Sequence, residues 1–193
     1  MNEKNSKEII LNKALPIFGR LGYQKTTMAD IANASKRGRR TIYMYFKNKE
    51  EIYAAVVEKE IDRIIEKIKR ELFQSSTIEE KLSTFIQLRV NEMIQLTNNY
   101  DALKTAFISN YKWVHKIRLK LDAQEKIILH SILNEAKTNA DFSIDDIEIT
   151  AKNISMIIRG VEYTLIKEGN ESQAEKHLNN LLNILINGLL ARQ

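Results

Sequence analysis

Apolar residues recur at intervals of three and four along most of the chain, which is the spacing of one face of an α-helix. The intervals predict long helices over residues 6–21, 49–73, 78–97, 113–138, 144–168 and 172–193, with a short helix or irregular segment over 100–111. Only six glycines and one proline interrupt the chain, and runs of alternating polarity are scarce. We therefore expect an all-α fold of about nine helices.

Several helix ends carry their own signals. Ser6 is placed to cap the first helix, and Gly22 to end it. Thr27 with Asp30, and Thr77 with Glu80, have the spacing of a capping box. The segment 143–146 predicts a third such start, and Gly169 predicts the end of the helix that follows it.

Two short helices lie close together near the N-terminus. Residues 28–34 and 39–46 are separated by a four-residue turn, which is the plan of a helix-turn-helix motif. In such a motif the first helix braces the second, and the second enters the major groove of DNA. The second helix suits this role, because Ile42 and Phe46 form one apolar edge and leave the rest of its surface exposed.

Charge is distributed unevenly between residues 1–50, which contain the helix-turn-helix and are called the head below, and the rest of the chain. Residues 1–50 hold eleven Lys/Arg and four Asp/Glu, a net charge of +7. Residues 51–193 hold nineteen Lys/Arg and twenty-one Asp/Glu, a net charge of −2. A basic head on a near-neutral body indicates a polyanionic partner at one end, although a basic solubilising surface would look the same.

Residues 26–32, residues 41–52 and the preceding residues 18–23 resemble the head of the TetR family of bacterial transcriptional regulators, over roughly residues 7–57. The resemblance implies that Thr27, Lys47 and Lys49 contact phosphates, and that Thr41, Tyr43, Met44 and Tyr45 meet bases and backbone. With the arginines of the turn and second helix, the candidate DNA-binding residues are Thr27, Arg37, Arg39, Arg40, Thr41, Tyr43, Met44, Tyr45, Lys47 and Lys49.

The turn departs from the family pattern, in which small or apolar residues and a glycine are common. Ser35, Lys36 and Arg37 stand there, and Gly38 takes the position of the usual capping serine. We expect Lys36 to adopt the left-handed conformation that glycine normally takes.

Other functional classes find little support in the sequence. There is no cysteine, no cluster of metal-ligand residues, no catalytic motif and no apolar stretch of the ~18 residues that a membrane span needs. The N-terminus is charged and lacks the apolar core of a signal peptide. We expect a cytoplasmic protein that is not an enzyme and uses no cofactor or metal.

The last two helices carry more apolar surface than one core face needs. From Ile144 to Leu165 apolar residues follow a 3–4 spacing over three heptads. Pairing of two chains into a four-helix bundle would bury this surface, and the family resemblance implies the same homodimer; an intramolecular core is the alternative. The candidate interface residues are Ile154, Ile158, Gly160, Val161, Leu165, Leu182, Leu185 and Leu189.

The middle helices hold most of the remaining aromatic residues. The resemblance implies a small-molecule pocket among them, although aromatic residues at helical spacing also suit a plain core. The candidate pocket residues are Phe85, Met93, Tyr100, Phe107, Tyr111 and Trp113.

These features predict a DNA-binding domain over residues 1–50 and a ligand-sensing and dimerisation domain over residues 51–193. The predicted function is a transcriptional regulator, a repressor that binds a near-palindromic DNA operator as a dimer and is released by a small-molecule effector. Two alternatives stay open: a ligand-independent DNA-binding structural or cell-division factor, and a helical protein-interaction module.

Overall fold

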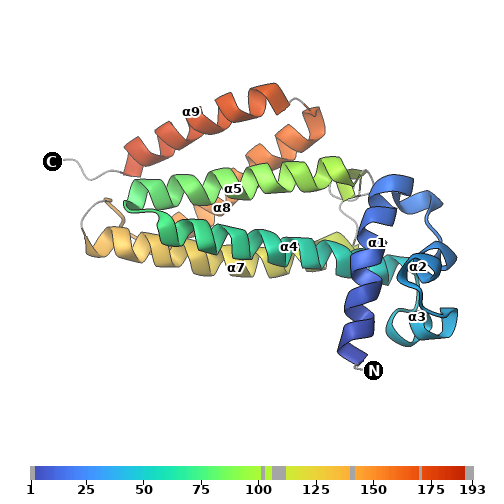
Figure 1. The fold of residues 1–193 in the computed structure, drawn as a ribbon. Coiled ribbons are helices and arrows are strands. Elements are labelled where there is room, and N and C mark those ends of the chain that lie inside the picture. Colours follow the sequence, from blue (N-terminus) through green and yellow to red (C-terminus); the bar gives the residue numbers. More distant parts are fainter. Residues whose placement is uncertain (1–2, 101–102, 106–111, 140–141, 170, 190–193) are drawn as a thin grey trace. The chain divides into compact units, whose positions relative to one another are not determined.

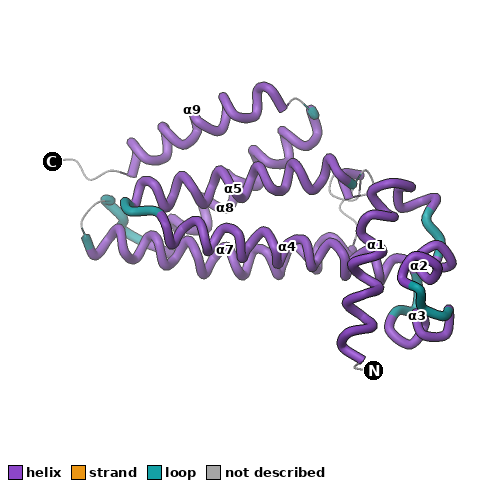
Figure 2. The backbone as a smooth tube through the Cα atoms, in the orientation of Figure 1, coloured by secondary structure: helices purple, strands orange, loops and turns teal. Residues whose placement is uncertain are grey.

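The computed structural model describes residues 3–100, 103–105, 112–139, 142–169 and 171–189. Figures 1 and 2 show that helices make up nearly all of this part, joined by short loops, and it contains no extended strand. The helices are α1 (Glu3–Lys25), α2 (Met28–Ser35), α3 (Arg39–Tyr45), α4 (Lys49–Gln74), α5 (Ile78–Asn99), α7 (Lys112–Thr138), α8 (Ile147–Glu168) and α9 (Glu171–Leu189). The all-α prediction is confirmed, and the segment 100–111 lies mostly outside the described residues.

Packing divides the chain into two units. The first combines Met1–Asp62 with Leu96–Ile117, and the second combines Arg63–Gln95 with Arg118–Gln193. Helix α4 therefore contributes residues to both units. The division of function after residue 50 stays a prediction.

Most of the predicted helix ends are confirmed. Gly22 interrupts α1 with φ 74° and ψ 160°, and one further turn follows it as far as Lys25. Thr27 and Asp30 form the expected capping box, and the hydroxyl of Thr77 accepts the amide of Glu80 at 3.1 Å. Gly169 ends α8 in the left-handed conformation, with φ 68°.

Two predicted helix starts are wrong. Helix α1 begins at Glu3, so Ser6 lies inside it rather than capping it. Helix α8 begins at Ile147 rather than at residue 144, because Asp146 is its cap and accepts the amide of Ile149 at 2.9 Å. An aspartate oxygen suits this position well, since it satisfies a free amide and its charge opposes the helix dipole.

The core of the first unit contains an aromatic cluster. Phe18 and Tyr53 meet edge to face with ring centroids 4.8 Å apart, and Tyr23 packs against Tyr53 at 5.0 Å. Ile10, Ile42 and Ile52 are fully buried. These contacts, together with the packing of α1 on α2, give the two short helices a rigid support.

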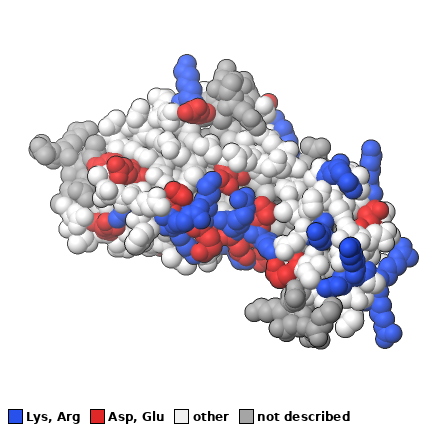
Figure 3. All heavy atoms as spheres, in the orientation of Figure 1, with Lys and Arg blue, Asp and Glu red and all other residues white. Residues whose placement is uncertain are grey.

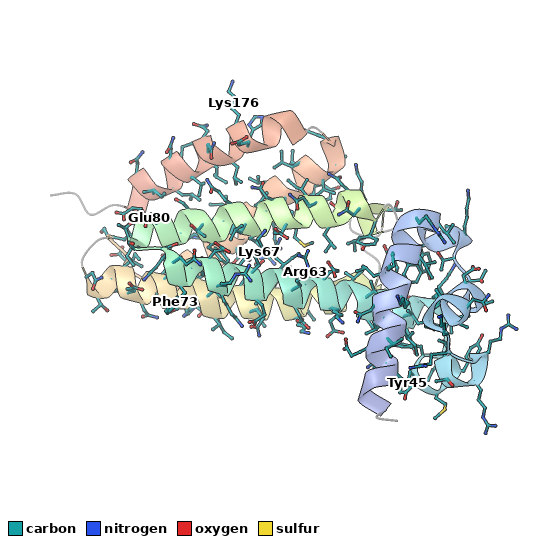
Figure 4. The ribbon with its side chains drawn as sticks, viewed as in Figure 1. Tyr45, Arg63, Lys67, Phe73, Glu80 and Lys176 are labelled. Atoms are coloured by element: carbon teal, nitrogen blue, oxygen red, sulfur yellow. The ribbon has the colours of Figure 1, made fainter. Side chains whose placement is uncertain are left out.

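Buried charge distinguishes the core of the second unit. Arg89 of α5 donates to both carboxylate oxygens of Glu162 of α8, at 2.8 and 3.2 Å, and its Nε donates to Glu125 of α7. All three side chains are almost inaccessible to solvent. Near the surface, two cations of α4, Arg63 and Lys67, are labelled in Figure 4. Both pair with the buried Glu92 of α5.

None of the described helices is long and apolar enough to cross a membrane. Among the described side chains, no group of three or more metal-ligating residues comes together.

Candidate nucleic-acid interface

Helix α3 has one buried edge and one exposed face, as its sequence predicts. Ile42 is fully buried and Phe46 is 4% exposed. On the other side, Tyr43 is 53% and Met44 69% exposed, although both are large and partly apolar. A short helix that presents such side chains to solvent on a rigid support has the form of a recognition helix.

Arginines extend the exposed face of α3 at its start. Arg39 and Arg40 are exposed, and neither side chain has an ion pair or hydrogen bond with the described residues. Figure 3 shows that Lys and Arg outnumber Asp and Glu on the visible surface of α2 and α3. This surface has free positive charge of the kind that attracts phosphates.

Two other candidates on α3 are less accessible. Thr41 and Tyr45 are both half-buried, and Tyr45 is labelled in Figure 4. Tyr45 already interacts within the chain. Their predicted contact with DNA stays untested, and Tyr43 offers the larger accessible aromatic surface.

The turn between α2 and α3 has the predicted left-handed lysine. Lys36 has φ 52° and ψ 39°, and it is the only described residue other than glycine with a positive φ. Its amide donates to Asn33 at 3.2 Å and the amide of Arg37 to Ala32 at 3.1 Å, a Schellman motif. Gly38 then caps α3 through its extended backbone, without a side-chain hydrogen bond.

Arg37 is placed differently from the arginines of α3. It is half-buried, and its Nε is buried without a hydrogen-bond partner among the described residues. The arginine is therefore held against the turn rather than fully extended into solvent, and its predicted contact with DNA stays a prediction.

The predicted phosphate contact Thr27 is engaged by its own helix. The hydroxyl of Thr27 donates to Asp30 Oδ2 at 2.7 Å, and the same oxygen accepts the Thr27 amide at 2.9 Å. These two hydrogen bonds lower the pKa of the Asp30 carboxyl. A phosphate at the start of α2 would therefore meet an ionised aspartate.

Lys47 and Lys49 have different environments. The side chain of Lys47 is exposed, whereas Lys49 is half-buried. Lys49 Nζ donates to the carbonyl oxygen of Tyr23 at 2.6 Å and to that of Gln24 at 3.2 Å. The same ammonium lies 4.4 Å from the centre of the Tyr23 ring.

The predicted pocket residues are distributed over both units and over the undescribed part of the chain. Phe85 and Met93 are buried in the second unit, and Tyr100 is half-buried in the first. Phe107 and Tyr111 lie outside the described residues, as does the side chain of Trp113. The pocket stays a prediction.

Half of the predicted dimer residues are covered within the single chain. Ile154, Ile158, Leu165 and Leu182 are at most 6% exposed. Val161 and Leu185 are half-buried, Gly160 is exposed, and the side chain of Leu189 is not described. The burial of these four residues fits the alternative of an intramolecular core for half of the predicted interface.

A different apolar set is left exposed on the same two helices. Ile149, Met156 and Tyr163 are spaced by seven residues along α8 and are 57%, 55% and 40% exposed. Ile184 of α9 is 62% exposed. The 3–4 pattern of the sequence marks the buried face, and these exposed apolar residues lie beyond it.

Comparison with known proteins identifies the head. Residues 10–56 match the model of the bacterial regulatory proteins of the tetR family. This range runs from α1 into α4 and includes the whole helix-turn-helix.

One relative matches over the length of the chain. The transcriptional regulator QacR of Staphylococcus aureus is 28% identical over 191 residues, 96% of this chain and 98% of the relative.

Solved structures share the fold. A transcriptional regulator from Cytophaga hutchinsonii superposes with a TM-score of 0.83 over 95% of this chain and 98% of the other, at 22% identity. The regulator FadR of Bacillus subtilis, solved in complex with stearoyl-CoA, gives a TM-score of 0.68 over 94% and 98% of the two chains, also at 22% identity. The head of the chain, over residues 10–56, therefore belongs to the tetR family of bacterial regulatory proteins, and the chain as a whole is similar to a transcriptional regulator.

Proposed function

We propose that this regulator represses transcription by binding a near-palindromic operator as a homodimer, and that a small-molecule effector releases it. The observation that carries the proposal is α3, whose exposed Arg39, Arg40, Tyr43 and Met44 stand opposite the buried Ile42 and Phe46. Arginine can pair with guanine in the major groove, and apolar contacts read the thymine methyl group. We also propose that it acts in the cytoplasm, and that it acts by binding DNA rather than by catalysis.

The exposed apolar line on α8 supports the homodimer. Ile149, Met156 and Tyr163, with Ile184 of α9, are large apolar side chains that the single chain leaves in water. Covering them with the same surface of a second copy gives an isologous interface with two-fold symmetry. A two-fold axis presents two copies of α3, which matches an operator with two related half-sites.

Relatives support an effector without fixing its identity. One neighbouring structure holds stearoyl-CoA, which is a property of that protein. For the present chain we infer a small molecule that binds the second domain and favours a state in which the two heads no longer fit successive grooves. The effector can shift this equilibrium only by the difference between its affinities for the two states.

A binding selection tests the proposal directly. Purified protein is mixed with genomic fragments, and bound fragments are recovered at moderate salt in the presence of random competitor DNA. We expect enrichment of a sequence with two inverted half-sites centred about one or more helical turns apart. The variant Arg39→Ala/Arg40→Ala serves as the control and should lose the enrichment.

Three results would contradict parts of the proposal. No preference for any duplex over competitor would exclude an operator-binding function and favour a protein-interaction module. Binding to an operator that no metabolite fraction weakens would exclude the effector and favour a structural DNA-binding factor. A bound species with one chain per operator would exclude the dimer.

A further inference from the structure

We propose that Lys49 is a positioning residue that fixes the junction of α1 and α2, and that it does not neutralise a DNA phosphate. The proposal rests on the DNA-binding function proposed above and assigns a different role to a lysine beside the recognition helix. It follows from three observations: what the ammonium binds, what occupies the start of α4, and which nearby cations are free.

The ammonium of Lys49 is held by the end of α1. Its two hydrogen bonds go to the carbonyl oxygens of Tyr23 and Gln24, at 2.6 and 3.2 Å. These carbonyls belong to the last turn of the helix, where carbonyl groups lack an intrahelical partner and the helix dipole is negative. The ring of Tyr23 covers the same ammonium at 4.4 Å, an additional attraction for a cation.

The contact spans the sequence and touches a defined part of the head. Lys49 is the first residue of α4, and it bonds residues 25 and 26 positions earlier in the chain. Tyr23 is itself packed against Phe18 and Tyr53 of the aromatic cluster. Thr27, which starts α2, follows Gln24 by three residues. Lys49 therefore connects the start of α4 to the end of α1, which leads directly into α2. Helix α2 in turn supports α3.

The start of α4 is already occupied by the chain's own groups. The side chain of Asn48 accepts the amide of Glu51 at 2.9 Å, and the carboxylate of Glu51 accepts the amide of Lys47 at 2.7 Å. A phosphate placed at these amides would have to displace a carboxylate and lie beside it. The N-terminus of α4 is thus not an open anion site, although helix N-termini often are.

Free positive charge lies close by on other residues. The side chains of Lys47, Arg39 and Arg40 are exposed, and none of them has an ion pair or hydrogen bond with the described residues. Moving any of these cations to a phosphate breaks no contact, whereas moving Lys49 breaks two hydrogen bonds and the contact with the ring. The electrostatic part of DNA binding is therefore assigned to the exposed cations.

The salt dependence of operator binding separates the two roles. Each phosphate contact contributes about 0.9 to the slope of log K against log salt concentration, so losing one contact per head lowers the slope of a dimer by about 1.8. We compare the full-length protein with Lys49→Met, which keeps the apolar stem, and with Lys47→Met as the matched control. Lys49→Gln, which keeps an N–H donor, is the second variant and stands in if Lys49→Met does not fold.

The expected results differ for the two lysines. Lys47→Met should lower the slope, whereas Lys49→Met and Lys49→Gln should keep the wild-type slope and lose affinity by a similar factor at every salt concentration, about tenfold for Met. Without DNA, Lys49→Met should speed amide hydrogen exchange at residues 23–28, and Lys47→Met should not. Lys49→Arg, which retains charge and donors, should restore both properties.

A drop in slope for the Lys49 variants equal to that of Lys47→Met, with unchanged exchange at residues 23–28, would overturn the assignment. Absence of operator binding by the wild-type protein would instead overturn the proposed function, and the exchange measurement on free protein would still decide whether Lys49 holds the junction.

Discussion

Single side chains in the head divide into those that build it and those that face outward. Hydrogen bonds within the chain engage the side chains of Lys49, Thr27 and Asp30. The side chains of Arg39, Arg40 and Tyr43 are instead exposed to solvent. Sequence spacing placed all of these residues in one motif. It could not separate the two groups, because a lysine or threonine looks the same whether its partner is a phosphate or a carbonyl.

Tyr43 is the clearest test of an outward-facing residue. Tyr43→Ala should weaken operator binding by about 1–3 kcal/mol, because half of its surface is free to contact DNA. Dimerisation should be unchanged, since the side chain is not part of the line on α8. Operator affinity and sedimentation of the same samples check both statements, with Phe73→Ala, which removes a 92% exposed aromatic residue of α4, as the control. Equal losses for the two variants would argue against a specific role for Tyr43.

Lys36 offers a stability test at the same scale. A left-handed backbone costs a residue with a Cβ roughly 1 kcal/mol relative to glycine, so Lys36→Gly should raise the free energy of unfolding by about that amount. Urea denaturation measures the change. Ala34→Gly, at an exposed position inside α2, should lower the free energy of unfolding by about 0.5–1 kcal/mol. A glycine should therefore destabilise the protein at position 34 and stabilise it at position 36. If both variants were destabilised, Lys36 would not be strained.

Whole helices were more predictable than single contacts. The apolar spacing located each described helix to within a few residues, and the capping boxes at Thr27 and Thr77 were confirmed, because both signals are local. The errors at Ser6 and residue 143 arose where several capping residues stand close together. Which one caps the helix is then decided by tertiary packing.

The start of α8 makes that correction measurable. Asp146→Ala removes the oxygen that accepts the amide of Ile149 and should destabilise the protein by about 1 kcal/mol. Ser143→Ala should have almost no effect, because Ser143 is exposed and lies four residues before the helix. Thermal unfolding of both variants provides the comparison, and a larger loss at Ser143 would return the cap to that residue.

At the scale of the whole molecule, the most unexpected feature is the buried charge. The sequence pattern marks Arg89, Glu125 and Glu162 as ordinary polar positions, because each is a single charged residue within a helix. Only their meeting from α5, α7 and α8 makes a cluster with two carboxylates for one guanidinium. Burial raises the pKa of Glu125 and outweighs the attraction of Arg89, while the charges of Glu162 and Asp122 raise it further.

A raised pKa in the folded state has a definite sign for stability. The contribution of Glu125 is fully present below its unfolded pKa, where the carboxyl is protonated in both states, and it is lost as pH rises through the folded pKa. Glu125→Gln replaces the titrating carboxyl with an amide, so the loss of stability with rising pH disappears. Arg89 keeps both of its hydrogen bonds to Glu162 in this variant. The stability of Glu125→Gln relative to wild type should therefore increase with pH above the usual range of a glutamate.

Glu148→Gln is the control of opposite sign. Its hydrogen bond from Lys126 lowers the pKa of the exposed Glu148 carboxyl, so its contribution is present at neutral pH and is lost as pH falls. Calorimetry across pH 4–8 should show the two variants diverging from wild type in opposite directions. Parallel curves for wild type and Glu125→Gln would show that Glu125 does not titrate differently in the folded protein.

Assembly is the other property of the whole molecule that can be tested by one residue. Met156→Glu places a charge in the middle of the exposed line on α8 and should shift the proposed homodimer to monomers at micromolar concentration. Ile127→Glu, at a 64% exposed position on α7, is the matched control and should leave assembly unchanged. Analytical ultracentrifugation distinguishes them. A dimer that survives Met156→Glu would place the interface elsewhere.

The exposed line of Ile149, Met156 and Tyr163 also affects how repression depends on the cellular concentration of the protein. If two copies must meet before both halves of an operator are read, then in a cell with few copies the occupied fraction rises with the square of the number present. A modest change in synthesis would then change repression more than proportionally. Variants with a weaker association would require a larger pool of protein to silence the same gene.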